Sequence, residues 1–159
     1  MGVDLLEYLN LLGQEKFRAI ILHAPPDKSP ELSKYSNRLL SNKAGAALDL
    51  LDYFLEEPKV ASDIDRFGPE QLKTVLLDRS HGKDLLIIDH LDFLLDTWRK
   101  DERQAFFRMV KQQWNSFLEN TRATLVFCLQ SSSEIEDLNI SDTRGRSRVL
   151  SLAELNEIL

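Results

Sequence analysis

The chain has 159 residues, of which 20 are basic and 26 acidic, so its formal net charge is −6. This length is typical of one domain, and a content of 43% apolar and 29% charged residues is typical of a globular protein rather than a disordered segment. The absence of a run of about 18 apolar residues excludes a transmembrane helix, and the acidic balance argues against a broad nucleic-acid-binding surface.

The N-terminal part of the chain predicts a helix followed by a buried strand. Apolar residues close to a 3.6-residue spacing predict an amphipathic helix within residues 2–15, which Gly13 ends. Residues 17–23 are a short apolar run, which predicts a buried strand. The segment Ala24-Pro25-Pro26-Asp27 follows this run directly, and its two prolines predict a turn.

Two further elements follow this turn. A helix is predicted over residues 30–41, with Pro30 at its first position and Ser29 as its N-cap. Residues 46–50 predict a second strand. Residues 51–55 continue this segment either as helix or as strand, and the sequence pattern leaves both open.

The middle of the chain predicts two strands and two helices. Residues 58–68 form a polar connection to a helix over residues 69–80. Residues 85–88 are apolar on both faces, as a central parallel strand must be, and residues 124–129 predict a second strand of this kind. Between them we predict one long helix over residues 96–120. Its buried stripe would contain Phe106, Phe107, Val110, Trp114, Phe117 and Leu118.

The complete pattern predicts an α/β fold. A last strand over residues 147–152 and a last helix over residues 153–159 bring the strands to five, interleaved with helices. Such alternation predicts a three-layer sandwich with a parallel sheet and helices on both faces. No shift in composition divides the chain, so we expect a single domain over residues 1–159, with an N-terminal helix in 1–15 and a core in 16–155.

Polar side chains follow the predicted strands where a parallel sheet places its functional crevice. These side chains are His23, Asp89 and Gln130. The carboxylate of Asp89 comes after the four apolar residues of 85–88, which is the pattern of a Walker B aspartate that holds Mg²⁺ beside a nucleotide. The alternative is that Asp89 caps the helix that follows.

The turn after the first strand occupies the place of a phosphate-binding loop and lacks most of its chemistry. A P-loop reads Gly-x-x-x-x-Gly-Lys-Ser/Thr, whereas residues 24–31 contain no glycine and place Pro30 and Glu31 at the lysine and hydroxyl positions. A shifted alignment uses Lys28 and Ser29 as the Lys–Ser pair. If ATP and Mg²⁺ bind here, the residues that hold the phosphates are Pro25, Pro26, Asp27, Lys28 and Ser29. The alternative is a proline-stiffened turn without a cofactor.

Other polar residues are candidates for nucleotide chemistry. His90 follows Asp89 at the position where Walker B strands usually carry the glutamate that orients a water, and a histidine can act as a general base. Asp92 would supply a second carboxylate or lie on the surface. Gln130 ends the strand beside Asp89, where a polar side chain can sense a γ-phosphate or cap the next segment.

A basic cluster precedes the last strand. Arg144, Arg146 and Arg148 surround Gly145, and such arginines can bind phosphate, contact DNA or reach a neighbouring subunit as arginine fingers. The alternative is a solvated loop.

The cysteine count bears on the compartment and on metal binding. Cys128 is the single cysteine, which excludes an internal disulfide, and residues 1–10 lack the basic start of a signal peptide, so we expect a cytoplasmic protein. Cys128 lies within a predicted strand and is expected to be a buried apolar residue. The histidines show no zinc-ligand spacing with it.

The order of these elements resembles the core of P-loop ATPases of the AAA and STAND type over about residues 15–155. More narrowly, residues 47–58, 85–98 and 123–130 are similar to BrxF, the small P-loop protein of some BREX bacteriophage-defence systems. The resemblance implies the strand order 5-1-4-3-2. It also implies a role in phage defence beside a methyltransferase and larger ATPases. The sequence departs from the AAA pattern in one further respect, since we expect no lid domain after the last strand.

The resemblance also implies roles for individual residues. Asp89 becomes the Walker B acid, Gln130 the sensor residue and residues 24–31 the phosphate loop. The first hypothesis is a regulatory or assembly subunit in phage defence with a degenerate Walker A loop. The second is an active ATPase that uses Lys28, Ser29 and Asp89, working as an oligomer, and the third is a DNA-associated adaptor.

Each hypothesis implies its own partners. The expected partners are other phage-defence subunits or further copies of the chain, and no membrane. DNA would be contacted only indirectly or through the cluster at residues 144–148.

Overall fold

The strands of the protein form one parallel sheet. A computed structural model describes residues 2–12, 18–42, 45–113 and 123–156 of the chain. The strands are β1 (Ala19–Ala24), β2 (Gly45–Asp49), β3 (Leu85–Asp89), β4 (Thr124–Gln130) and β5 (Val149–Ser151). They pair in the order β2-β3-β4-β1-β5, and all neighbours are parallel. The predicted α/β class, the parallel sheet and the strand order 5-1-4-3-2 are therefore confirmed.

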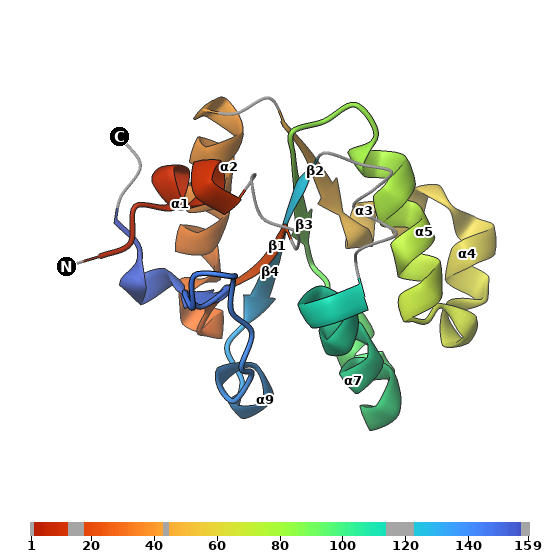
Figure 1. Ribbon diagram of the computed structural model, residues 1–159. Helices are drawn as coiled ribbons and strands as arrows, with labels where there is room; N and C mark the ends of the chain where they lie inside the picture. The colour runs from red at the N-terminus through yellow and green to blue at the C-terminus, as the bar shows by residue number, and fades with distance from the viewer. Residues whose placement is uncertain (1, 13–17, 43–44, 114–122, 157–159) are drawn as a thin grey trace.

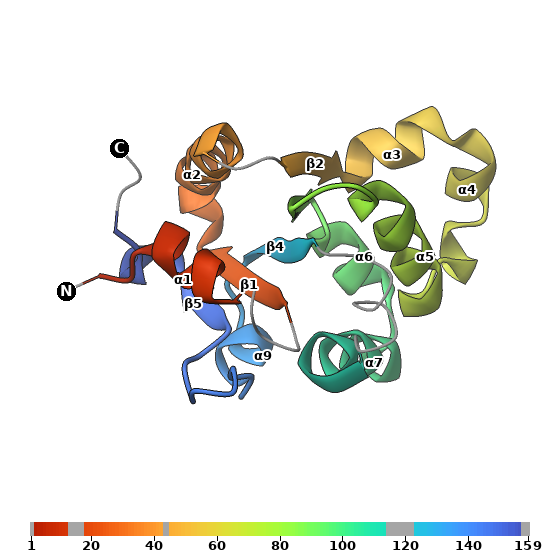
Figure 2. The same cartoon turned by 45° about the horizontal axis from the view of Figure 1, so that its top comes forward.

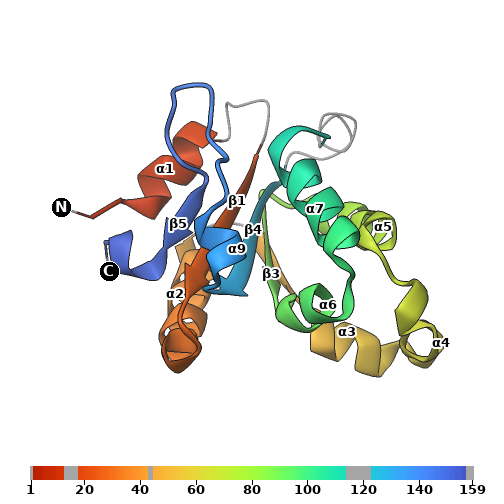
Figure 3. The same ribbon diagram turned by 90° about the horizontal axis from the view of Figure 1, so that it is seen from below.

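Helices cover both faces of this sheet. They are α1 (Leu5–Leu12), α2 (Ser29–Asn42), α3 (Leu50–Glu56), α4 (Pro58–Ser62), α5 (Pro69–Ser80), α6 (Asp92–Thr97), α7 (Lys100–Arg108) and α9 (Ser133–Glu136). In Figure 1, α1 and α2 lie on one side of the sheet, and α3, α5 and α7 lie on the other. Figure 3 shows α6 on the same side as α7. Figure 2 shows the same three layers, with α4 at the outer edge.

The strand residues alternate between the two layers of core. On β1, Ala19 and Ile21 belong to the core under α3, α5, α6 and α7, whereas Ile20 and Leu22 belong to the core under α1 and α2. All six residues of β1 are buried. Because a parallel strand inside a three-layer fold has no solvated face, its sequence is a continuous apolar run rather than an alternating one.

The helical conformation after β1 begins earlier in the chain than predicted. A 3₁₀ turn over Pro26–Lys28 precedes α2, with Pro25 as its N-cap and Pro26 at its first position, where the missing proline N–H costs nothing. The helix itself starts at Ser29. The prediction of Ser29 as a side-chain cap for a helix starting at Pro30 is therefore wrong, because the prolines before it start the helical path earlier.

The two segments after β2 are helical. Asp49 caps α3 by accepting hydrogen bonds from the backbone N–H groups of Leu51 and Asp52, at 3.0 and 3.4 Å, which makes residues 51–55 helix. The predicted polar connection over residues 58–68 is wrong in part, since it contains α4 and a 3₁₀ turn over Ile64–Arg66. Pro58 opens α4 at its first turn.

The predicted helix over residues 96–120 is wrong at its start. Trp98 is extended, with φ −68° and ψ 146°, and it separates α6 from α7. Its indole Nε1 donates a hydrogen bond to the carbonyl of Phe67 at 2.7 Å, and this tertiary contact fixes the break. Arg99 is the N-cap of α7, and its backbone N–H donates a hydrogen bond to Glu102 Oε1 at 3.1 Å.

The far end of that predicted helix is described only in part. Phe106, Phe107 and Val110 are buried as predicted, and Met109–Gln113 forms a π-helical turn after α7. Trp114, Phe117 and Leu118 lie outside the described residues, as does Gly13.

The two ends of the described chain meet beside β5. Of the predicted N-terminal helix, Leu5–Leu12 is helical, and Val3 pairs with Leu155. The predicted helix over residues 153–159 is replaced, as far as the chain is described, by a 3₁₀ turn over Leu152–Glu154. No helix in the described part of the chain is long and apolar enough to cross a membrane.

Candidate functional site

The carboxyl edge of the sheet gathers the polar residues that end the strands. Because the strands are parallel, His23 of β1, Asp49 of β2, Asp89 of β3 and Gln130 of β4 all lie at this edge. The sequence predicted this placement for His23, Asp89 and Gln130. Strand β4 separates β1 from β3, so the β1 turn and Asp89 are on the two sides of Gln130.

The turn after β1 offers few donors to a phosphate. Pro25 and Pro26 have no N–H group, the N–H of Lys28 donates to the carbonyl of Pro25 at 2.8 Å, and the N–H of Ser29 donates to the carbonyl of Pro26. Within this segment that leaves the N–H of Asp27, whose own carboxylate repels an anion. A phosphate cradle needs several converging N–H groups, so these residues do not fit a triphosphate.

His90 is turned toward β2. Its backbone has φ 61°, a left-handed conformation that is uncommon outside glycine. Its Nδ1 lies 2.9 Å from Asp49 Oδ1, and its N–H donates to Asp89 Oδ1 at 3.0 Å. Since β2 and β4 lie on opposite sides of β3, the ring leans away from the β1 turn. The predicted general base therefore does not face the predicted phosphate loop.

The contacts of His90 shift its pKa. Burial lowers the pKa of the imidazole, but the hydrogen bond to Asp49 and the charges of Asp89, Asp49 and Asp92 outweigh burial, so the pKa is raised. The protonated form is therefore favoured in the folded chain. Its stabilisation is complete below the unfolded pKa of about 6.5 and is lost as pH rises through the raised folded-state pKa.

We expect the replacement His90→Asn to cost more stability at low pH than at high pH. Asparagine tolerates the left-handed backbone, so the variant removes mainly the ion pair with Asp49. The side chain of His90 is 49% exposed, so solvent limits the effect to less than about 1 kcal/mol. Urea unfolding at acid and alkaline pH measures it, with His81→Asn as the matched control. An equal cost at both pH values would contradict the assigned role of the pair.

Asp92 and Gln130 join β3 to β4. The N–H of Gln130 donates to Asp92 Oδ1 at 2.9 Å. Burial raises the pKa of Asp92, against the effect of this hydrogen bond. Both residues line a pocket of about 420 Å³ that also contains the ion pair of Arg103 with Glu134, at 3.1 Å. Asp92 is thus a partly buried structural acceptor as well as a second carboxylate near Asp89.

The carboxylates at this edge do not converge on one point. Among the described residues, no group of three or more histidine, cysteine, aspartate or glutamate side chains could hold a metal ion. Asp89 is half-buried and accepts the N–H of His90. A Mg²⁺ ion would therefore have Asp89 as its main protein ligand and would depend on phosphate oxygens for the rest.

The three arginines of the basic cluster, Arg144, Arg146 and Arg148, differ in burial and in their partners. Arg148 is 1% exposed and donates to the carbonyls of Ala19 and Val110, both at 3.0 Å. Arg146 pairs with Asp142 at 2.7 Å and covers the ring of Tyr8, 4.7 Å from its centroid. Arg144 is exposed on the loop. The prediction of a three-arginine surface for phosphate or DNA is therefore wrong for Arg148, because its guanidinium is used inside the fold.

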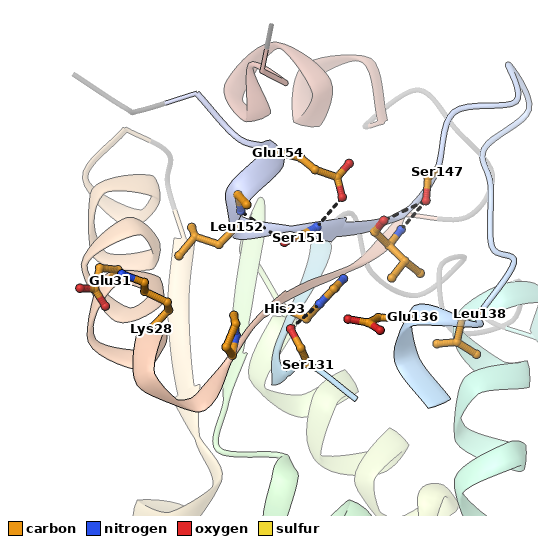
Figure 4. Close-up of a pocket in the computed structure, with 13 residues that line it drawn as sticks. His23, Lys28, Glu31, Ser131, Glu136, Leu138, Ser147, Ser151, Leu152 and Glu154 are labelled. Carbon is orange, nitrogen blue, oxygen red and sulfur yellow. Dashed lines mark hydrogen bonds between the residues drawn. The ribbon is translucent and has the colours of Figure 1, made fainter. Parts of the chain in front are cut away.

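A pocket lies over the ends of β1, β4 and β5 (Figure 4). It has a volume of about 700 Å³, and His23 lies in it with Nδ1 2.8 Å from Ser131 Oγ. Burial lowers the pKa of His23, while the charges of Glu136 and Glu154 act in the opposite direction. The sequence predicts His23 at this edge of the sheet but not its contact with Ser131. A histidine inside an otherwise apolar strand and a serine after another strand were the signals for it.

The single cysteine lies apart from both pockets. Cys128 is buried within β4, and its Sγ lies 3.3 Å from Ser36 Oγ. Burial raises the pKa of its thiol to about 12. A thiol held in this way is neutral and unreactive, which confirms the predicted role of Cys128 as a buried apolar residue.

Comparison with known proteins does not assign a family. No protein-family model matches the chain, and no curated protein matches it either.

Proposed function

We propose that this chain is a regulatory or assembly subunit built on a P-loop NTPase fold, with a degenerate phosphate loop and no nucleotide turnover. The observation that carries the proposal is the β1–α2 turn. Its two prolines lack N–H groups, and the N–H groups of Lys28 and Ser29 bond inside the turn. A triphosphate at this position would meet the carboxylate of Asp27 and few donors.

The position of the water-activating group gives independent support. A hydrolytic site needs a base that reaches the attacking water beside the γ-phosphate. His90 follows Asp89 in the sequence, but its ring bonds to Asp49 on the side away from β1. The alternative of an active ATPase would require both this ring and the turn to be rebuilt by a partner or a further copy of the chain.

The setting in bacteriophage defence is part of this proposal. It rests on the similarity of residues 47–58, 85–98 and 123–130 to BrxF. The strand order and the position of Asp89 at the end of β3 agree with what that resemblance implies. We accordingly infer a cytoplasmic protein whose partners are other defence subunits, and whose contribution is binding rather than catalysis.

A DNA-associated adaptor is the weaker alternative. Of the three predicted arginines, Arg148 is buried and Arg146 is paired with Asp142. Arg144 alone would give a small phosphate contact. The test of the proposed function is a thermal melt of the purified chain with and without Mg-ATP, in which the two curves should coincide.

A further inference from the structure

The pocket over β1, β4 and β5 carries negative charge on an apolar frame. Its walls include Pro25, Leu138, Val149, Leu152 and Ala153. Its carboxylates belong to Glu31, Glu136 and Glu154, and its one lysine is Lys28. Lys28 and Glu31 lie at the same end of α2 and have opposite charges (Figure 4). The charges of Lys28 and Glu31 sum to zero, so the net negative charge of the pocket equals that of Glu136 and Glu154.

These two carboxylates have no basic partner in the described chain. Among the described residues, the carboxylate of Glu136 forms no ion pair or hydrogen bond, and the carboxylate of Glu154 accepts only the N–H of Ser151, at 3.1 Å. Both act on His23 electrostatically, and Figure 4 draws the Glu154 carboxylate beside β5 and the Glu136 carboxylate next to His23. An anionic ligand such as a nucleotide would be repelled here, whereas a cationic group would be attracted and could form a charge-assisted contact with either carboxylate.

His23 adds a neutral acceptor to this region. The residue is 7% exposed, and its Nδ1 is taken by Ser131 Oγ. No described residue bonds its Nε2, and Figure 4 shows the ring inside the pocket between Ser131 and Glu136. When Nδ1 donates to Ser131, Nε2 is an acceptor directed at the bound molecule.

We infer that this pocket is a binding site for a small aliphatic amine or guanidine, held by Glu136, Glu154 and His23 Nε2. The volume of about 700 Å³ lies within the range of about 300–1,000 Å³ that small-molecule sites occupy. The cationic group would lie against the carboxylates, and the aliphatic part would lie against Leu138 and Val149. This inference goes beyond the proposed function and stands without it, because no nucleotide takes part.

The experiment is a titration of the full chain with cadaverine and agmatine at low ionic strength, followed by melting temperature and by calorimetry. Both amines should raise the melting temperature, since a ligand of the folded state stabilises it. Neutral 1,5-pentanediol, which has the chain length of cadaverine, should not. Failure of both amines at millimolar concentration would overturn the inference, whatever the Mg-ATP melt shows.

Variants locate the binding. In the double variant Glu136→Gln with Glu154→Gln, the amide oxygen of residue 154 can still accept from Ser151, and cadaverine should bind at least about tenfold more weakly. The control, Glu56→Gln with Glu70→Gln, removes the same charge from exposed sites that do not line the pocket and should bind as the wild type does. Equal affinity in the two double variants would overturn the inference.

A second variant tests whether the amine occupies the volume of the pocket, and it leaves the charge of the pocket unchanged. Ala153 lines the pocket and is exposed, so Ala153→Trp should fill part of the volume and weaken cadaverine binding while both carboxylates remain. Undiminished binding by Ala153→Trp would show that the amine binds elsewhere and would overturn the inference.

Discussion

Replacing Arg148 by methionine is expected to destabilise the protein by about 3–5 kcal/mol, one of the two largest single-residue effects that we predict. Arg148 is 1% exposed, and its guanidinium donates hydrogen bonds to four carbonyl groups, at distances of 3.0–3.1 Å. The acceptors are Ser141, Ala19, Val110 and Lys111. They belong to separate parts of the chain, so Arg148 joins β1, the π-helical turn and the loop before β5.

Arg148→Met is expected to lower the stability because the four carbonyl groups that accept from Arg148 lose their donor. Removing a buried cation recovers its desolvation cost, but a methionine leaves the carbonyls without a donor, at about 1–3 kcal/mol for an unsatisfied buried group. A lysine would keep the charge and lose the planar fork that reaches several acceptors at once. Arg148→Lys should therefore also be less stable than the wild type.

Urea unfolding of Arg148→Met measures this effect, with Arg144→Met as the matched control. Arg144 is exposed on the same loop, so its replacement should change stability by no more than about 0.5 kcal/mol. Equal stabilities of the two variants would contradict the buried role of Arg148. The result also bears on the adaptor hypothesis, because any loss of DNA binding in Arg148→Met would follow from unfolding.

The second large effect is expected for Phe106→Ala, at about 3–5 kcal/mol. Phe106 is fully buried, and its ring lies 5.2–5.8 Å from the rings of Trp98, Phe107 and Phe127. It thus joins α7 to β4 and to the break after α6. The truncation removes apolar burial, leaves a cavity and ends three aromatic contacts.

A thermal melt of Phe106→Ala should show a midpoint roughly 6–20 °C below that of the wild type, since 1 kcal/mol corresponds to about 2–4 °C at this size. Leu55→Ala is the control, because Leu55 is 79% exposed. A loss of stability in Phe106→Ala no greater than in Leu55→Ala would contradict the packing described around β4.

The sequence predicts the sheet well because the sheet depends on local patterns. Continuous apolar runs indicate β1, β3 and β4, and the turn signals place Asp89 and Gln130 at the carboxyl edge. The break at Trp98 could not be predicted, since it depends on a hydrogen bond to Phe67, 31 positions away. Local propensity favours helix through this segment, and the tertiary contact overrides it.

The candidate sites also depend on contacts between distant residues, which local sequence patterns do not predict. Arg148 looks like a member of a basic loop, and its burial depends on acceptors as far as 129 positions away in the sequence. His23 and Ser131 are 108 positions apart and meet because β1 pairs with β4. Spacing along the chain could therefore indicate the edge of the sheet but not the pocket above it.

The most direct test of the central claim is the melting temperature of the chain with saturating Mg-ATP. A site that bound ATP at 100 times its dissociation constant would add about 2.7 kcal/mol of stability, or roughly 5–11 °C. We predict no shift, and the same melting temperature for Asp89→Asn with and without Mg-ATP. A rise in the wild type would contradict the account, and its disappearance in Asp89→Asn would place the bound nucleotide at the predicted Walker B residue.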